Sequence, residues 1–312
     1  MQHKLLVLVS TPAYSRLHGP LVYLSEHLLT PGTLVRVPLG VRETLGLVWP
    51  GDIPASAVDE ATKLRPVLEA LDHIGPLTAR WMELMGFAAA YYQRSAGEFA
   101  LGSLPPQLRD LNNLQLARKL NKRAKRESSS EAPAPVNLQV PAPTPEQALA
   151  MQRLSAEQGP FVLHGNTGSG KTEVYLRRAA LVLEDAPQAQ VLLLVPEINL
   201  TPQLEARVRQ RFAHLGDSAI VAMHSAMTPA QRLNSWLAAH LGSARIVLGT
   251  RLAVLASMPN LKLIVVDEEH DPSYKQQEGA RYSARDLAVY RGQLEGAQVL
   301  LGSATPSLES WH

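Results

Sequence analysis

A glycine-rich octapeptide in the second half of the chain has the spacing of a phosphate-binding loop. Residues 165–172 read GNTGSGKT and match G-x-x-x-x-G-K-[ST] at every position. Glycines let the backbone turn several N–H groups toward phosphate oxygens, and Lys171 adds a positive charge for the β- and γ-phosphates. The Thr172 hydroxyl can bind Mg²⁺. We therefore expect ATP and Mg²⁺ to be held by Gly165, Asn166, Thr167, Gly168, Ser169, Gly170, Lys171 and Thr172.

An acidic sequence, DEEH at residues 267–270, ends the apolar run LKLIVV. At the end of a strand, Asp267 would hold Mg²⁺ and Glu268 would orient or deprotonate the attacking water. A charged turn that does no chemistry is the plain alternative. A zinc site built from Glu268, Glu269 and His270 is disfavoured, because adjacent side chains point in different directions and no second histidine follows at i+4. We expect His270 to couple this motif to another part of the lobe.

The elements that must position these residues can be read from the apolar pattern. From about residue 146, apolar runs alternate with helix-length segments, which predicts an α/β fold with a parallel sheet buried on both faces. The ligand of such a sheet lies at the carboxyl ends of its strands. The expected strands are Phe161–His164, Gln190–Val195, Ala219–His224, Arg245–Leu248, Leu261–Asp267 and Gln298–Leu301.

The rest of the chain divides into two zones. Residues 1–105 predict a small β-rich domain with strands at Lys4–Val9, Thr33–Pro38 and Thr44–Trp49, the last two forming a hairpin, and a helix near Leu77–Tyr92. Residues 106–145 predict a basic, Pro- and Ser-rich linker. Its basic run LARKLNKRAKRE (116–127) could be a solvated helix face or an arm that contacts phosphates.

Composition sets wide limits on function. The 312 residues carry a formal net charge of +2, so bulk charge alone does not indicate a nucleic-acid binder. The chain has no cysteine, which excludes disulfides and thiolate metal sites within it. No signal peptide or membrane span is evident, and we expect a cytoplasmic protein with no membrane partner.

Longer stretches resemble a known family. DEEH together with GSATPS (302–307) resembles the superfamily 2 helicases. The segments VPEINLTPQL (195–204), HSAMTPAQRLNSWL (224–237), VLGTRLAVLASMPNL (247–261) and the stretch from 267 to 291 are similar to the PriA family of replication-restart DNA helicases. The resemblance implies a RecA-like P-loop lobe at 146–312, the first of two helicase lobes, behind a small β-rich 3′-end DNA-binding domain at 1–105.

The resemblance also implies roles for single residues of the lobe. Lys171, Asp267 and Glu268 would serve ATP hydrolysis, and Gln147 would read the adenine edge. The residues expected to bind DNA or couple hydrolysis to its movement are Thr250, Arg251, His270, Tyr274, Lys275, Arg281, Tyr282, Arg285, Ser303 and Thr305. Among them, Tyr274 and Tyr282 would stack on bases and Lys275, Arg281 and Arg285 would contact phosphates. Packing at the surface is the alternative for each tyrosine.

In the N-terminal domain, Gly40 and Arg65 stand where the family captures a 3′-terminal nucleotide. The family's Phe-Asp-Tyr cluster is replaced here by Leu21-Val22-Tyr23, which removes its carboxylate.

As a whole, the resemblance implies an ATP-dependent 3′→5′ DNA helicase that acts at stalled or branched replication forks in primosome assembly and replication restart. Its partners would be forked and single-stranded DNA, primosome proteins and single-stranded-DNA-binding protein. The family's winged helix is expected to be missing here, and its second lobe and zinc-binding cysteines are expected only in a C-terminal part that this chain lacks, so little ATPase activity is expected from the chain alone. A fork-binding scaffold without motor activity is the main alternative, and an RNA or branch-migration helicase is a more distant one.

Overall fold

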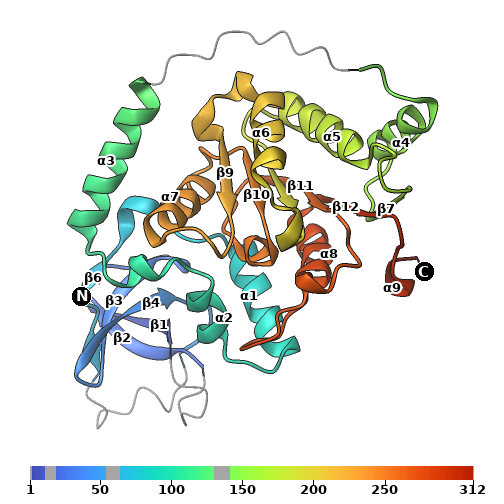
Figure 1. The fold of residues 1–312 in the computed structure, drawn as a ribbon. Helices are drawn as coiled ribbons and strands as arrows, with labels where there is room; N and C mark the ends of the chain where they lie inside the picture. The colour runs from blue at the N-terminus through green and yellow to red at the C-terminus, as the bar shows by residue number, and fades with distance from the viewer. Residues whose placement is uncertain (1, 11–18, 54–63, 130–140, 312) are drawn as a thin grey trace. The chain divides into compact units, whose positions relative to one another are not determined.

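The computed structural model describes residues 2–10, 19–53, 64–129 and 141–311 (Figure 1). The chain forms two compact units, Met1–Ser129 and Ser130–His312. Most of the Pro- and Ser-rich stretch expected as a linker, residues 130–140, lies outside the described residues.

The first unit contains a mainly antiparallel six-stranded sheet in the order β5-β2-β1-β4-β3-β6. The predicted hairpin is confirmed, because β3 and β4 pair antiparallel up to Leu39 and Arg42 and only two residues join them. A core of apolar side chains that includes Val7, Val35 and Val48 covers one face of the sheet. The strands are β1 (His3–Val9), β2 (Leu21–Ser25), β3 (Leu34–Leu39), β4 (Arg42–Val48), β5 (Arg65–Pro66) and β6 (Glu69–Ala70).

In the described residues, three helices complete this unit. Helix α1 (Ala79–Tyr91) begins at the cap residue Thr78, as the pattern at 77–92 predicted, and α2 (Ala96–Gly102) begins at Ser95. Gly97 of α2 lies against β1, where an added Cβ would stand 2.4 Å from the Val9 carbonyl oxygen. The short turns are η2 (Asp72–Ile74) and η3 (Pro106–Arg109), and the third helix is α3 (Asn113–Ser129).

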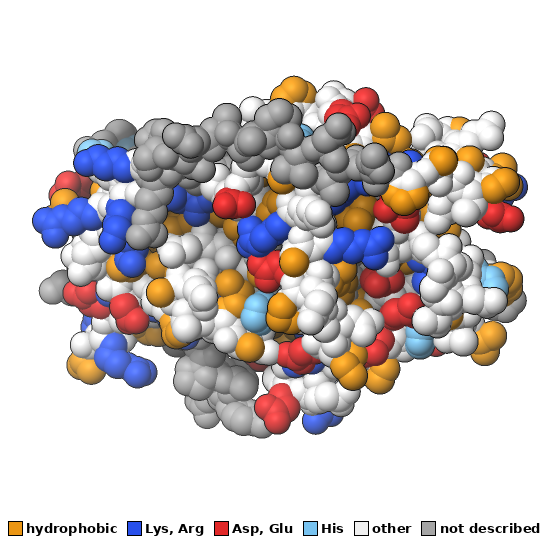
Figure 2. All heavy atoms as spheres, turned by 45° about the horizontal axis from the view of Figure 1, so that its top comes forward, with side chains coloured by type: hydrophobic (Ala, Val, Ile, Leu, Met, Phe, Trp, Pro, Cys, Tyr) orange, Lys and Arg blue, Asp and Glu red, His pale blue; other side chains and the backbone are white. Residues whose placement is uncertain are grey.

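Residues 106–129, expected as the start of the linker, contain folded elements of the first unit. Leu108 and Leu116 are fully buried, and the Arg36 guanidinium donates to the carbonyl oxygens of Arg109 and Leu111 at 2.7 and 3.2 Å. Beyond Leu116, helix α3 presents exposed basic residues, and Figure 2 shows Lys and Arg side chains gathered over it. The basic run is thus a helix, which fits both of its open readings.

The second unit is built on the predicted parallel sheet, in the order β7-β12-β11-β8-β10-β9 (Figure 1). All six expected strands are present within about two residues. Successive residues of β8, such as Leu192 and Leu193, are both buried, which confirms a sheet covered on both faces. The strands are β7 (Phe161–His164), β8 (Gln190–Leu194), β9 (Ile220–Met223), β10 (Ile246–Gly249), β11 (Leu261–Val266) and β12 (Gln298–Ser303).

Helices flank this sheet, and α5 and α6 contribute Tyr175, Leu176, Val208 and other apolar side chains to its main core. The helices are α4 (Pro145–Ala156), α5 (Lys171–Asp185), α6 (Pro202–Arg211), α7 (Pro229–His240), α8 (Ala284–Glu295) and α9 (Leu308–Trp311). The short turns are η4 (Glu197–Asn199), η5 (Ala213–Leu215), η6 (Asp217–Ala219), η7 (Arg251–Leu255) and η8 (Pro272–Tyr274). In the described residues, no helix has the length and apolar character that a membrane crossing requires.

Candidate nucleotide site

The GNTGSGKT loop connects the carboxyl end of β7 to the start of α5, as a phosphate-binding loop must. Gly168 and Gly170 have φ angles of +80° and +86°, a region that favours glycine. Helix α5 begins at Gly170 with no side-chain cap, whereas six other helices begin at a capping Ser or Thr: Thr78, Ser95, Thr144, Thr201, Thr228 and Ser283. The first turn of α5 is therefore suited to an anion rather than to a cap made by its own chain.

Lys171 is held inside this loop. Its side chain is only 8% exposed, and its ammonium donates to the carbonyl oxygen of Gly165 at 2.7 Å and to that of Asn166 at 3.4 Å. The same Nζ lies 3.6 Å from Oε1 of Glu268. The loop thus concentrates positive charge directly beside the second acid of the DEEH motif.

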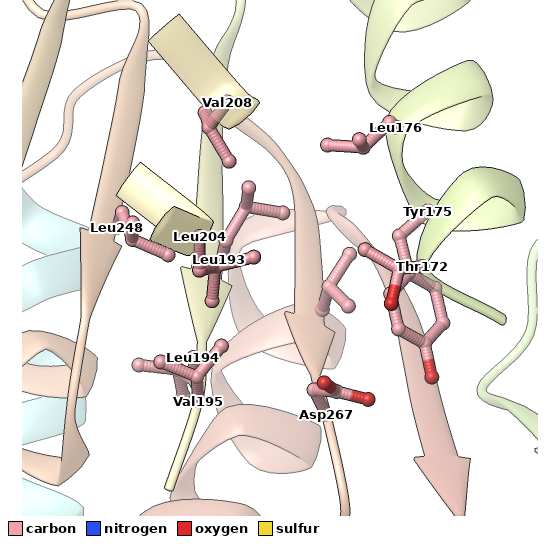
Figure 3. Close-up of a pocket in the computed structure, with 11 residues that line it drawn as sticks. Thr172, Tyr175, Leu176, Leu193, Leu194, Val195, Leu204, Val208, Leu248 and Asp267 are labelled. Carbon is pink, nitrogen blue, oxygen red and sulfur yellow. The ribbon is translucent and has the colours of Figure 1, made fainter. Parts of the chain in front are cut away.

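Asp267 follows β11 at the carboxyl edge of the sheet, where its backbone N–H donates to the Leu194 carbonyl oxygen at 2.9 Å. Asp267 and Thr172 line one small pocket between β11, β8 and α5, shown in Figure 3. The two expected Mg²⁺ ligands are therefore neighbours. Burial and the charge of Glu268 raise the pKa of Asp267, against the opposing effects of Tyr175 and Lys171. A divalent cation would offset the cost of ionising Asp267 in this buried position, so the donor set fits Mg²⁺.

Glu268 adopts the left-handed backbone region, with φ of +45°. This conformation is strained for a residue with a side chain and is typical of functional positions. It turns the carboxylate toward the phosphate loop, where Oε1 faces Lys171 and Oε2 lies 3.7 Å from Nδ1 of His270. The side chain remains partly exposed, so it can meet a water molecule.

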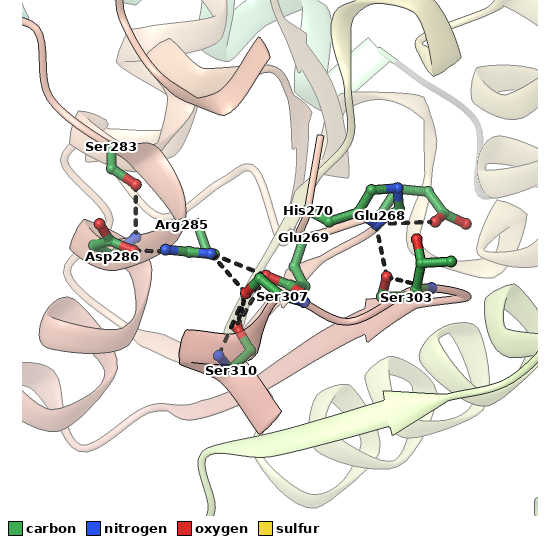
Figure 4. A network of polar contacts seen from close by, with 10 residues as sticks. Glu268, Glu269, His270, Ser283, Arg285, Asp286, Ser303, Ser307 and Ser310 are labelled. Atoms are coloured by element: carbon green, nitrogen blue, oxygen red, sulfur yellow. Dashed lines mark hydrogen bonds and ion pairs between the residues drawn. The ribbon is translucent and has the colours of Figure 1, made fainter. Parts of the chain in front are cut away.

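Glu269 points away from the phosphate loop into a buried polar network (Figure 4). Its carboxylate accepts hydrogen bonds from the backbone N–H of Ser307 at 2.7 Å, the Ser310 hydroxyl at 2.9 Å and the Arg285 guanidinium at 3.3 Å. Burial alone would raise the pKa of Glu269, but these hydrogen bonds outweigh it and the pKa lies below its usual value. Sequence reasoning gave Glu269 no role beyond the disfavoured zinc site. In the described residues, no group of three His, Cys, Asp or Glu side chains is placed to hold a metal ion.

His270 joins the acidic motif to the GSATPS motif. Its Nδ1 lies 2.6 Å from the hydroxyl oxygen of Ser303, which is fully buried and also accepts the backbone N–H of Thr305 at 3.0 Å (Figure 4). This arrangement is the geometry that a coupling role would require, and the role itself stays a prediction.

Gln147 lies beside the phosphate loop, where its Nε2 donates to the Gly170 carbonyl oxygen at 3.4 Å. Its Oε1 accepts the backbone N–H of Thr144 at 3.1 Å, which completes a capping box at the start of α4. Recognition of adenine by Gln147 stays a prediction.

The segment after DEEH differs from the expectation for its two tyrosines. Tyr274 is 2% exposed and donates its hydroxyl to the Asp267 carbonyl oxygen at 2.6 Å, and Tyr282 is 4% exposed. A buried ring offers no face to a base, so the stacking role expected for both residues is corrected. Both rings are packed in the lobe interior. The sequence did not predict this, because spacing alone does not distinguish a buried aromatic residue from an exposed one.

The basic side chains of this segment divide into those paired within the lobe and those exposed to solvent. Arg285 is bound to Glu269 and Asp286, and Arg251 donates to Oε1 of Gln276 at 2.6 Å. Lys275 and Arg281 are exposed on a small hairpin closed by the Lys275–Ser283 bridge. Thr250, at the end of β10, is 4% exposed, so its side chain has little surface for a DNA backbone.

In the first unit, the residues expected at a 3′-end pocket do come together. Gly40 lies in the β3–β4 turn with φ of +64° and open space around it, and Arg65 donates to its carbonyl oxygen. Tyr23 is buried and donates to the Pro38 carbonyl oxygen at 2.9 Å. Leu21 and Val22 are partly buried on β2.

Comparisons with known proteins agree with this geometry. Residues 144–311 match the family model of the DEAD/DEAH box helicases, and residues 6–105 match that of the 3′DNA-binding domain (3′BD) of PriA. The chain belongs to the DEAD/DEAH box helicases.

Its curated relatives are replication restart proteins named PriA, which confirms the resemblance to that family. The protein from Haemophilus influenzae is 34% identical over 89% of this chain and 46% of its own length. The protein from Rickettsia felis is 34% identical over 94% and 42%, and the one from Synechocystis sp. is 47% identical over 56% and 21%. The chain thus spans less than half the length of these relatives.

Proposed function

We propose that this chain provides the DNA-end-binding unit and the ATP-binding lobe of an ATP-dependent 3′→5′ DNA helicase that acts at stalled or branched replication forks during replication restart. One observation carries the proposal: a complete phosphate loop, a Mg²⁺-type carboxylate and a strained, loop-facing glutamate converge at one edge of the sheet. The match of residues 6–105 to the PriA 3′-end-binding domain supports DNA as the substrate.

In the proposed reaction, the loop and the first turn of α5 bind the phosphates of ATP. Lys171 exchanges its contacts with the Gly165 and Asn166 carbonyl oxygens for phosphate oxygens, which are better partners for a cation. Thr172 and Asp267 would hold Mg²⁺, which would supply charge neutralisation at the phosphates. Glu268, across from Lys171, orients a water molecule and accepts its proton.

Coupling to DNA runs through His270 in this proposal. When Glu268 releases or gains contacts at the phosphates, the imidazole 3.7 Å away responds, and its bond to Ser303 passes the change to the GSATPS segment. Lys275 and Arg281 contact the DNA backbone, and Gly40 with Arg65 receives a DNA 3′ end. Primosome proteins and single-stranded-DNA-binding protein are the partners that the family resemblance implies.

The nucleotide part of the proposal is tested with a fluorescent ATP analogue in the presence of Mg²⁺. Lys171→Ala is expected to weaken binding at least about 100-fold, because a buried charge-assisted contact is lost. Lys262→Ala, an exposed lysine at the opposite end of β11, is the matched control and should bind normally. Equal binding by the wild type and Lys171→Ala would reject the nucleotide site.

The DNA part is tested with this chain joined to the second helicase lobe that the family resemblance implies, by strand displacement on forks that offer a single-stranded tail of only one polarity. Displacement from a 3′ tail, lost in Lys171→Ala, supports a 3′→5′ motor. Tight fork binding that persists without displacement in any variant would instead favour the scaffold.

A further inference from the structure

Tyr175 lies next to the proposed Mg²⁺ site, and neither the motifs nor the proposed mechanism gives it a role. It is on α5 three residues after Thr172, a spacing that places both side chains on one helix face. The residue is 3% exposed and lines the same pocket as Thr172 and Asp267, as Figure 3 shows. Its hydroxyl end therefore lies at the edge of the sheet that carries the catalytic acids.

Gly302 of β12 makes room for this hydroxyl. An ideal Cβ on Gly302 would stand 1.4 Å from the Tyr175 hydroxyl oxygen and 2.5 Å from its Cζ. Gly302 is not among the glycines with positive φ, so its backbone alone does not require glycine. What requires it is the tyrosine side chain that crosses from α5 to the strand carrying Ser303.

The Tyr175 hydroxyl is a buried polar group without a proper partner. It makes no hydrogen bond that meets ordinary distance and angle limits. The Asp267 carboxylate lines the same pocket and lies near the hydroxyl end of the tyrosine ring (Figure 3). Buried hydroxyls are nearly always hydrogen-bonded, so the Tyr175 hydroxyl is a candidate donor for the Asp267 carboxylate that lines the same pocket.

We propose that Tyr175 is a positioning residue of the Mg²⁺ site: its hydroxyl donates a hydrogen bond to the Asp267 carboxylate in the MgATP-bound state, and Gly302 keeps the space that this requires. The inference rests on the proposed nucleotide function. A hydrogen bond to a charged carboxylate is stronger than one between neutral groups. The hydroxyl then fixes the orientation of the Asp267 carboxylate, at the place where α5 lies beside the ends of β11 and β12.

The experiment measures the stability and the Mg²⁺ requirement of Tyr175→Phe in the full chain. Without nucleotide, the variant should melt at the wild-type temperature or above it, because the change removes an unsatisfied buried hydroxyl and keeps the ring. With a fluorescent ATP analogue, the Mg²⁺ concentration for half-maximal binding should rise about tenfold, the effect of one hydrogen bond to a charged group. Nucleotide binding in EDTA should not change.

Tyr23→Phe is the matched control. Its hydroxyl is hydrogen-bonded to the Pro38 carbonyl oxygen, so removal should lower the melting temperature and leave the Mg²⁺ requirement unchanged. Gly302→Ala approaches the same contact from the other side, because its methyl group must displace the Tyr175 ring. It should raise the Mg²⁺ requirement, and the double variant with Tyr175→Phe should need no more Mg²⁺ than the more affected single variant. If Gly302→Ala does not fold, Tyr175→Phe decides the question alone.

The outcomes separate this inference from the function on which it rests. A wild-type chain that binds no nucleotide refutes the nucleotide site, and the inference falls with it. A wild-type chain that binds MgATP, with an unchanged Mg²⁺ requirement in Tyr175→Phe, overturns the inference alone. A clear loss of melting temperature in nucleotide-free Tyr175→Phe also overturns it, because it would show that the hydroxyl already has a structural partner.

Discussion

Replacing Glu269 by alanine should destabilise the helicase lobe far more than removing any exposed acid. The Glu269 side chain is fully buried and accepts hydrogen bonds from Ser307, Ser310 and Arg285 (Figure 4). Its removal leaves the Ser307 N–H and the Ser310 hydroxyl without this acceptor, and it leaves Asp286 as the remaining carboxylate partner of Arg285. Breaking a buried charged pair in this way costs about 3–5 kcal/mol. In a unit of this size, about 1 kcal/mol shifts the melting temperature by roughly 2–4 °C, so a fall of roughly 6–20 °C is expected.

The assay is differential scanning calorimetry of the full chain at neutral pH, with Glu309→Ala as the control. Glu309 is exposed on α9, within the same short segment as Ser310, and its removal should shift the transition little. Glu269→Gln should fall between the two, because the amide keeps one acceptor oxygen and loses the charge, at a cost of roughly 1.5–3 kcal/mol. If Glu269→Ala melted within about 2 °C of Glu309→Ala, the network would contribute little to stability and the reasoning would be wrong.

The pH dependence of this difference has a definite sign. Hydrogen bonds hold the pKa of Glu269 below its usual value of about 4.3 in the folded state. A carboxyl group with a lowered folded-state pKa contributes stability above its unfolded pKa and loses it as the pH falls through the folded value. The gap between the wild type and Glu269→Gln should therefore be constant from neutral pH to about 5 and shrink below about 4.

Three further predictions concern the neighbouring residues. The pKa of Asp267 is raised in the folded state, so folding disfavours its ionised form and the wild type loses stability as the pH rises. Without nucleotide at pH 7, Asp267→Asn should therefore melt at a higher temperature than the wild type. MgATP should not raise the melting temperature of this variant. Because Glu268 has φ of +45°, Glu268→Gly should be more stable than Glu268→Ala in chemical denaturation, by about 1 kcal/mol; equal stabilities would show that the backbone is not strained. Replacing both Lys275 and Arg281 by alanine should leave the melting temperature unchanged. The slope of the logarithm of the DNA-binding constant against the logarithm of the salt concentration should become shallower by the amount of about two phosphate contacts. An unchanged slope would show that the DNA does not contact these two residues.

The sequence predicted the parts of the fold whose determinants are local. Each buried strand is a short apolar run such as that of β11, and the phosphate loop carries its chemistry in eight consecutive residues. The fate of Glu269 could not be read this way, because its partners Ser307, Ser310 and Arg285 lie 16 to 41 positions away along the chain. Tyr175 escaped notice for the same reason, since its significance depends on Gly302, a residue of another strand.

The tyrosines after DEEH and residues 106–116 show the same way in which composition misleads. Tyr274 and Tyr282 stand among Lys, Gln and Arg, which suggested an exposed nucleic-acid surface, yet both rings are buried. Residues 106–116 are followed by a run of basic residues, which suggested that the core had ended, yet Leu108 and Leu116 are fully buried. In each case a few apolar contacts decided the placement, and the polar neighbours only determined which side remained in water.

The four residues of DEEH have separate structural roles, because the chain turns sharply after β11. Asp267 faces the pocket beside Thr172, and Glu268 faces Lys171. Glu269 is fixed in a buried network, whereas the His270 side chain is partly exposed and contacts Ser303 and Glu268. A fully buried carboxylate with several hydrogen bonds holds one arrangement, whereas a partly exposed imidazole beside the Glu268 carboxylate can exchange partners at small cost. Glu269 is therefore suited to keep the turn rigid while His270 changes partners, so a signal from the phosphates should leave the motif through the histidine.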